Sequence, residues 1–261
     1  MPSAKKLHAW IETDLPLGGG RAILVAGEPV SSIAGTRADW PLLREFLGPN
    51  PAARCPDHLP GRAAVGYFTY EGDFWFGLHE HVEVLPESAW RSSREGARVG
   101  APQSTLSPDA FHTRVRRIHD YIRAGDVYQV NLTRTIRAPF AGCPRALFSR
   151  LRTISPAPFA AFLEAPGRTI VSASPELFLR TAGPVVETRP IKGTRPRFKE
   201  PSLDHRAAEE LVASDKERAE LVMITDLERN DLGRVCAYGS VEVTRLAERQ
   251  SFAQVHHLVS T

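Results

Sequence analysis

The sequence predicts an α+β fold in which short antiparallel strands are combined with a few helices. Between residues 159 and 188, four apolar segments are separated by turns containing Pro and Gly, as in an antiparallel sheet. Two longer segments, one on each side of these strands, lack helix breakers and have helical character. With 261 residues, 42% of them hydrophobic, the chain can bury a real core as one large domain or two small ones.

An N-terminal region of short strands and turns is predicted over residues 1–105, followed by a second domain over residues 106–261. The stretch Ser92–Ser107 is rich in Arg, Ser, Gly and Pro and is interpreted as the linker. The elements expected in the first region are a buried strand at Arg21–Ala26, a short amphipathic helix at Trp40–Leu47, and paired strands at Val65–Tyr70 and Phe74–Phe76.

The second domain is predicted to open with a helix. Ser107 is a suitable N-cap, Pro108 occupies the first helical position, and Gly125 ends the helix. The other expected elements are a strand at Val127–Ile136, a helix at Leu147–Leu151, strands at Phe159–Leu163, Thr169–Ala173, Leu177–Leu179 and Val185–Thr188, one bent helix or two over Asp204–Ala213 and Asp215–Arg229, and a strand at Val241–Thr244.

Composition and charge exclude several classes of function. The formal net charge is +3, from 33 basic and 30 acidic residues without a long basic tract, which argues against a nucleic-acid-binding protein. No apolar run is long enough to span a membrane. Cys55, Cys143 and Cys236 are far apart and form no C-x-x-C pair, as expected in a reducing compartment. Because no secretory signal is present, we expect a cytoplasmic protein.

Lys192 is the most informative single residue, because it lies between a proline and a glycine in Pro190-Ile-Lys-Gly-Thr194. A lysine on a rigid turn after a strand is well placed to reach a ligand. As a nucleophile it must first lose its proton, which burial or a nearby cation favours. Taken alone, the segment fits a solvated surface turn better than a ligand site.

Three further groups could carry chemistry. Glu176, on a turn between two apolar strands, is either a partly desolvated general acid or an exposed turn residue. Glu217 and Glu220 share one helix face and could bind Mg²⁺, whereas Ser214 and Glu217 could instead form a capping box. His257 and its neighbour His256 lie on opposite faces if this segment is a strand, and most lone histidines are structural.

Together these segments resemble one family, the chorismate-utilising enzymes. It comprises anthranilate synthase component I, aminodeoxychorismate synthase component I, and the isochorismate and salicylate synthases. The resemblance runs from Ser107 to the end of the chain, and it implies an antiparallel fold packed with outer helices. The segments that carry it are Tyr128–Thr133, Ser172–Glu176, Pro190–Thr194, Asp215–Gly233 and His257–Ser260.

Two positions separate the members of this family. Anthranilate synthases resemble this chain but carry alanine where Lys192 stands, and isochorismate and salicylate synthases carry a lysine base where Gln129 stands. The combination of Gln129 and Lys192 resembles aminodeoxychorismate synthase component I, which aminates chorismate to 4-amino-4-deoxychorismate in folate and 4-aminobenzoate biosynthesis. The alternatives are anthranilate synthase component I and a non-catalytic fragment that only binds a partner.

The resemblance also implies roles for individual residues. Lys192 would attack C2 of chorismate while Glu176 protonates the departing C4 hydroxyl. Ammonia from a glutamine amidotransferase subunit would then add at C4 and expel the lysine. The remaining assignments are Glu220 as the Mg²⁺ ligand with support from Glu217, His257 beside the leaving hydroxyl, and Thr194 with Gly193 lining the ring site.

The sequence departs from the family pattern at its C-terminal end. The family continues past the His-Leu-Val-Ser motif through a glycine-rich segment, a tyrosine and an arginine that bind substrate carboxylates, and a late glutamate of the Mg²⁺ site. These features are not in the 261 residues. We therefore expect a fold that is incomplete at the C-terminus and a polypeptide that alone makes little or no product; robust amination by the purified chain would contradict this.

Overall fold

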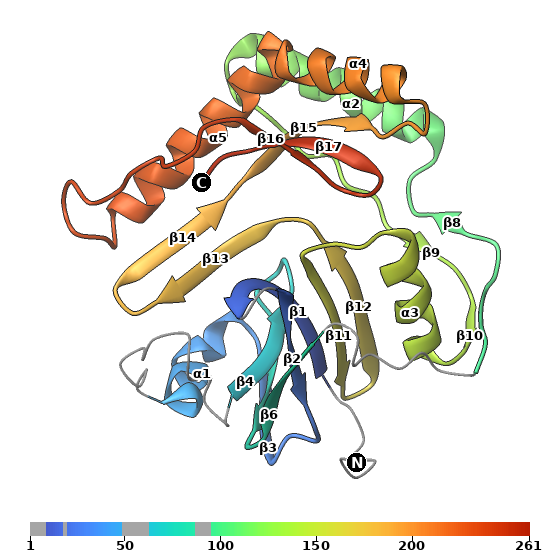
Figure 1. The fold of residues 1–261 in the computed structure, drawn as a ribbon, viewed down its shortest axis with the longest axis vertical. Helices are drawn as coiled ribbons and strands as arrows, with labels where there is room; N and C mark the ends of the chain where they lie inside the picture. Colours follow the sequence, from blue (N-terminus) through green and yellow to red (C-terminus); the bar gives the residue numbers. More distant parts are fainter. Residues whose placement is uncertain (1–8, 18–19, 49–62, 87–94) are drawn as a thin grey trace. The chain divides into compact units, whose positions relative to one another are not determined.

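The computed structural model describes residues 9–17, 20–48, 63–86 and 95–261 (Figure 1). The chain forms two compact units, one from Met1–Ser92 together with Phe148–Thr261 and the other from Ser93–Leu147. The α+β class with antiparallel sheets is confirmed, since every strand pair described is antiparallel. The domain boundary predicted at residues 105 and 106 stays a prediction.

A five-stranded sheet forms one part of the larger unit, in the order β12-β11-β1-β2-β6. Phe148 of α3 (Pro144–Ile154) and Phe162 of β11 are fully buried against Trp10, with the two phenylalanine rings 5.8 Å apart. The predicted strands near residues 21, 159 and 169 are confirmed. The strands of this sheet are β1 (Ala9–Leu17), β2 (Gly20–Ala26), β6 (Val82–Pro86), β11 (Phe159–Ala165) and β12 (Arg168–Ser174).

A smaller sheet in the order β3-β5-β4 confirms the predicted hairpin in the N-terminal region. Its strands are β3 (Ser31–Gly35), β4 (Ala63–Phe68) and β5 (Phe74–His79), and a one-turn helix η1 (Arg37–Asp39) leads into α1 (Trp40–Leu47). Trp75 of β5 is buried against Ala9, Ala26 and Leu163 of the five-stranded sheet. The alternation of buried and partly exposed residues along β5 explains why the sequence pattern identified it.

The C-terminal part of the larger unit carries the segments that predict chemistry. β13 (Leu177–Ala182) and β14 (Val185–Arg189) form a hairpin, and β15 (Ile191–Pro196), β17 (Val255–Val259) and β16 (Glu248–Ser251) form a three-stranded sheet in that order. α4 (Pro201–Val212) and α5 (Asp215–Gly233) both contact β15 and β17. A core of Leu211, Leu221, Ala247 and Leu258 lies between them.

Two expectations for this part are resolved by local chemistry. The helical run is two helices, because Ser214 leaves the helical conformation and its hydroxyl accepts from the Glu217 backbone N–H, which starts α5. The strand predicted at Val241–Thr244 is wrong. That segment forms no ladder, although the Thr244 N–H donates to the Thr261 carbonyl at 3.0 Å.

The smaller unit consists of α2 (Pro108–Ala124) and two short strand pairs. β7 (Ala97–Val99) pairs with β10 (Phe140–Gly142), and β8 (Gln103–Ser104) pairs with β9 (Ile136–Arg137). The caps predicted for α2 are confirmed: Ser107 accepts from the Ala110 N–H, and Gly125 is left-handed at φ 81°. The strand predicted at Val127–Ile136 is wrong, because only Ile136 finds a ladder partner.

Among the described residues, none of the helices is both long and apolar enough to cross a membrane.

Candidate active site

Lys192 lies within β15, not on a turn as its neighbours Pro190 and Gly193 predicted. β15 pairs with β17, with Lys192 opposite Leu258, and a bulge follows between Lys192 and Thr194. Gly193 forms this bulge with a φ of +75°, a left-handed conformation that glycine adopts without strain. The rigid turn predicted around Lys192 is therefore wrong, because Pro190-Ile-Lys-Gly-Thr194 runs into a bulged strand in which Gly193 is the left-handed residue.

The missing side chain of Gly193 lets α5 approach β15. A Cβ atom built there would lie 3.0 Å from Leu211 Cδ1 and 3.1 Å from Glu217 Cβ. Either contact is too close for an ordinary carbon pair. Glycine at this position therefore brings the first turn of α5, with Glu217, beside the strand that carries Lys192.

Thr194 and His257 come together across the β15–β17 ladder. His257 Nδ1 lies 3.0 Å from Thr194 Oγ1 and 3.2 Å from the Gly193 carbonyl oxygen. The Phe252 ring packs edge-on at a centroid distance of 5.5 Å. These contacts fix one ring nitrogen of His257 against the bulge and leave its other nitrogen on the opposite side of the ring.

Glu176 lies between β12 and β13, as predicted, and its side chain is exposed. Its Oε1 accepts a hydrogen bond from the Ile191 backbone N–H at 3.0 Å. This bond ties the carboxyl group to the residue immediately before Lys192. The structure thus brings the predicted acid and the predicted nucleophile to the same end of β15.

Glu217 and Glu220 lie one turn apart on α5. Glu217 Oε1 is 3.3 Å from Arg195 Nη1 in a partly exposed ion pair. No cluster of three or more His, Cys, Asp or Glu side chains that could hold a metal occurs in the part of the chain that the structure describes. Mg²⁺ is commonly held by one or two carboxylates, with water and substrate oxygens completing its shell. The pair fits such a site, with Arg195 competing for Glu217.

His256 belongs to a separate cluster, on the opposite face of β17 from His257, as predicted for adjacent strand residues. The His256 ring contacts Ser251 Oγ at 2.8 Å and Asp204 Oδ1 at 3.1 Å. Arg197 Nε donates to both oxygens of Asp204. Hydrogen bonds from Arg197 and from the Phe198 N–H hold the pKa of Asp204 well below its ordinary value of 3.8. This cluster ties α4 to β17 and serves the fold.

Glu228 is the functional candidate that the sequence did not single out. It lies towards the C-terminal end of the highly charged helix α5, where a glutamate is usually solvated, and its partner Thr188 is forty residues earlier in the chain. Glu228 is half-buried, and this burial raises the pKa of its carboxyl group. The charges of Glu176 and Asp231 also raise this pKa, whereas the Thr188 hydroxyl and Lys192 lower it.

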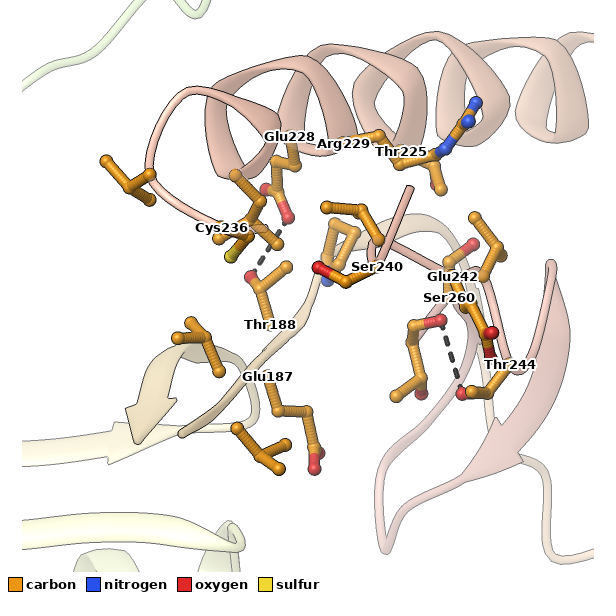
Figure 2. A pocket seen from close by; sticks show the side chains of 18 of the residues that line it. Glu187, Thr188, Thr225, Glu228, Arg229, Cys236, Ser240, Glu242, Thr244 and Ser260 are labelled. Carbon is orange, nitrogen blue, oxygen red and sulfur yellow. Dashed lines mark hydrogen bonds between the residues drawn. The ribbon is translucent and has the colours of Figure 1, made fainter. Parts of the chain in front are cut away.

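Beside Glu228, a partly open cavity of about 730 Å³ is lined by β14, the end of α5, the segment between Val235 and Thr244, and the last two residues of the chain. Figure 2 shows Glu228 and Thr188 joined by a hydrogen bond at its edge. Val185, Leu232 and Val241 supply apolar walls. Lys192 is not a lining residue, whereas Pro190, Thr188 and Glu228 are.

Gln129 lies in the smaller unit, in a segment without regular secondary structure before β9, whereas Lys192 lies in the larger one. The two residues whose combination resembles aminodeoxychorismate synthase component I therefore belong to different units.

The fold is that of anthranilate synthase component I and of isochorismate synthase. The structure superimposes on anthranilate synthase component I from Streptococcus pneumoniae with a TM-score of 0.77 and 21% identity, covering 94% of this chain and 69% of that one. On the menaquinone-specific isochorismate synthase from Escherichia coli the TM-score is 0.63 at 13% identity, covering 99% and 64%. At these identities the likeness concerns the fold alone.

The family follows from the sequence match. A model of the chorismate binding enzyme family matches residues 75–261, and the chain belongs to that family.

Curated relatives carry two different names. The chain is 48% identical over 158 residues to an anthranilate synthase component 1 of Haloarcula marismortui, covering 60% of this chain and 32% of that protein. It is 43% identical over 190 residues to the aminodeoxychorismate synthase component 1 of Escherichia coli, covering 70% and 42%. The chain thus spans less than half the length of these relatives, and neither name is favoured by identity.

Proposed function

We propose that the chain carries the nucleophile and acid of an aminodeoxychorismate synthase component I, which aminates chorismate at C4. The observation that carries this proposal is Lys192 on β15, with the Glu176 carboxyl hydrogen-bonded to the neighbouring Ile191 N–H at 3.0 Å. An amine nucleophile and a carboxylic acid held at the same end of one strand suit a displacement in which one group attacks and the other protonates the leaving group.

In the proposed reaction, the neutral amine of Lys192 forms a bond to C2 of chorismate. The ring double bonds shift, the C4–O bond breaks, and Glu176 donates its proton so that the hydroxyl leaves as water. Ammonia then forms the C4–N bond, the double bonds shift back, and Lys192 leaves from C2. His257, held by Thr194 and the Gly193 carbonyl, would lie beside the leaving hydroxyl.

Mg²⁺ would be held by Glu220 with Glu217 in support, and it would neutralise carboxylate charge on the substrate when bound. The position of Glu217 against Gly193 supports this placement, because it sets a carboxylate beside the lysine strand. Ammonia would come from a glutamine amidotransferase subunit, in keeping with the "component 1" in the relatives' names.

Product identity tests this function. The purified chain is incubated with chorismate, Mg²⁺ and an ammonium salt, and the products are separated and identified. Because the 261 residues do not include the late Mg²⁺ ligand and the carboxylate-binding residues of the family, we expect only a small amount of product. We expect that product to be 4-amino-4-deoxychorismate and to be lost in Lys192→Ala. Anthranilate formed equally by the wild type and Lys192→Ala would support the anthranilate synthase alternative. Calorimetry that shows no Mg²⁺-dependent chorismate binding would favour the non-catalytic alternative.

A further inference from the structure

The Thr188 hydroxyl contacts two oxygen atoms at once. Its Oγ1 lies 2.6 Å from the Phe178 carbonyl oxygen and 2.9 Å from Glu228 Oε2. A hydroxyl group has one hydrogen to donate, and a backbone carbonyl can only accept. The shorter contact therefore takes the Thr188 hydrogen, because two oxygens at 2.6 Å without a hydrogen between them would repel.

The Phe178 carbonyl needs that hydrogen because the β13–β14 ladder is interrupted there. The register shifts between Leu177 and Arg180, so Phe178 and Leu179 face the single residue Thr188. The bulge takes Phe178 out of the regular ladder pairing, and the Thr188 side chain binds its carbonyl instead. The donor role of Thr188 is thus set by the backbone of β13.

A Thr188 hydroxyl that donated to Glu228 would lower the Glu228 pKa. Because its one hydrogen goes to the Phe178 carbonyl at the shorter distance, Thr188 Oγ1 instead accepts from Glu228. An ionised carboxylate is an acceptor alone, whereas a protonated one carries an O–H donor. A contact of 2.9 Å is therefore favourable when Glu228 holds a proton. We propose that Glu228 is a neutral carboxylic acid that donates to Thr188, and that it positions Glu176 and Lys192 for their reaction.

The positioning follows from the path of these bonds. Glu228 on α5 holds Thr188 on β14, and Thr188 holds the Phe178 carbonyl, two residues after Glu176. Glu176 in turn accepts from the Ile191 N–H, next to Lys192. The segments that carry the acid and the nucleophile are thereby fastened to one helix.

Charge adds a second effect. The groups whose charge acts on Glu228 are Glu176, Lys192 and Asp231. The other charged groups around the cavity are Glu187 of β14, paired with Arg180 and Arg189, Arg229 of α5, paired with Asp226, and Glu242. When Glu228 is neutral, the negative charge of Glu176 and the positive charge of Lys192 balance each other. An ionised Glu228 would add negative charge and hold the proton on Lys192 more tightly.

The sign of the stability effect follows from burial, which raises the pKa of Glu228 above its ordinary value of 4.5. The folded state then binds this proton more tightly than the unfolded state. The corresponding stability is present below the ordinary value and is lost as the pH rises through the raised pKa. Glu228→Gln keeps a neutral donor at every pH and should not show this loss.

The test uses the 261-residue chain, Glu228→Gln and Glu228→Ala, with Asp226→Asn as a matched control on an exposed part of the same helix. Carbon-13 NMR follows the Glu228 carboxyl against pH, assigned by its absence in Glu228→Gln. We expect it to titrate above 4.5. Titration at or below that value would overturn the proposal.

A second readout is the rate at which an acylating reagent modifies Lys192, measured by mass spectrometry across pH. Only the neutral amine reacts with the reagent, so a tenfold smaller fraction of neutral Lys192 slows the modification about tenfold. Above the Glu228 transition we expect faster modification in Glu228→Gln than in the wild type, with Asp226→Asn close to the wild type. Equal rates in Glu228→Gln and the wild type would contradict the charge effect, and Glu228→Gln remains informative if Glu228→Ala does not fold.

The role of Glu228 in the reaction depends on the proposed function, but these two measurements need no chorismate. If both succeed and Lys192 fails to react with chorismate, the proposed function alone is wrong. If Lys192 reacts with chorismate equally well in the wild type and Glu228→Ala, the positioning role of Glu228 is wrong.

Discussion

Replacing Gly193 with alanine tests the packing that brings α5 against the Lys192 strand. Two costs arise in the folded state. The residue has a φ of +75°, which an L-amino acid with a side chain adopts at a cost of roughly 1–2 kcal/mol. The new methyl group would also lie 3.0 Å from Leu211 Cδ1 and 3.1 Å from Glu217 Cβ, and overpacking of this kind costs about 1–3 kcal/mol.

Gly167 provides a matched control, because it separates the two costs. Its φ of +73° is nearly the same, but a Cβ atom there would meet nothing within 4 Å. Gly167→Ala should therefore carry only the backbone cost, roughly 1–2 kcal/mol. Gly193→Ala should lose the same amount plus about 1–3 kcal/mol from the contacts with Leu211 of α4 and Glu217 of α5.

The assay is urea unfolding of the wild type and both variants, followed by circular dichroism, with free energies compared at equal denaturant dependence. We expect Gly193→Ala to be the less stable variant. Equal destabilisation of the two variants would refute the reasoning, since it would mean that neither α4 nor α5 approaches β15 closely at Gly193. The placement of Glu217 beside the lysine strand would then lose its support.

Three other changes test the fold around the site. The lowered pKa of Asp204 provides stability that is present above pH 3.8 and is lost as the pH falls below it, and Asp204→Asn should remove this stability. Acid unfolding of Asp204→Asn should therefore depend less on pH than that of the wild type. An unchanged acid unfolding profile would argue against the Arg197–Asp204–His256 cluster. Ser214→Ala should cost about 1 kcal/mol in urea unfolding by removing the N-cap of α5, whereas no loss would mean that the cap is not formed. Phe162→Ala, at a fully buried position, should cost about 3–5 kcal/mol; a loss below about 1 kcal/mol is expected only of a surface residue.

Local chemistry made much of the fold predictable. The bounds of α2 follow from Ser107, Pro108 and Gly125, which act within one turn of the helix ends. The hairpins between Phe159 and Arg189 follow from apolar segments and turn residues. The strand predicted at Val127–Ile136 failed because a strand also needs a partner, and pairing is a tertiary property.

The candidate site was predictable where a motif holds its geometry in a few residues. Lys192 and Gly193 signal an unusual backbone, although the bulge depends on β17, which lies more than sixty residues later. Glu228 could not be found in this way. Its character comes from burial and from Thr188 on another strand, while its own neighbours in sequence are those of a solvated helix.

The most direct test of the central claim is whether Lys192 forms a covalent bond to chorismate. The wild-type chain, Lys192→Ala and Glu176→Gln are incubated with chorismate and Mg²⁺ without ammonia, and the intact protein and its peptides are analysed by mass spectrometry. The account predicts an adduct with the mass of chorismate less one water on the Lys192 peptide of the wild type, absent from Lys192→Ala and reduced in Glu176→Gln. Chorismate that binds without forming this adduct, or an adduct that persists in Lys192→Ala, would contradict it.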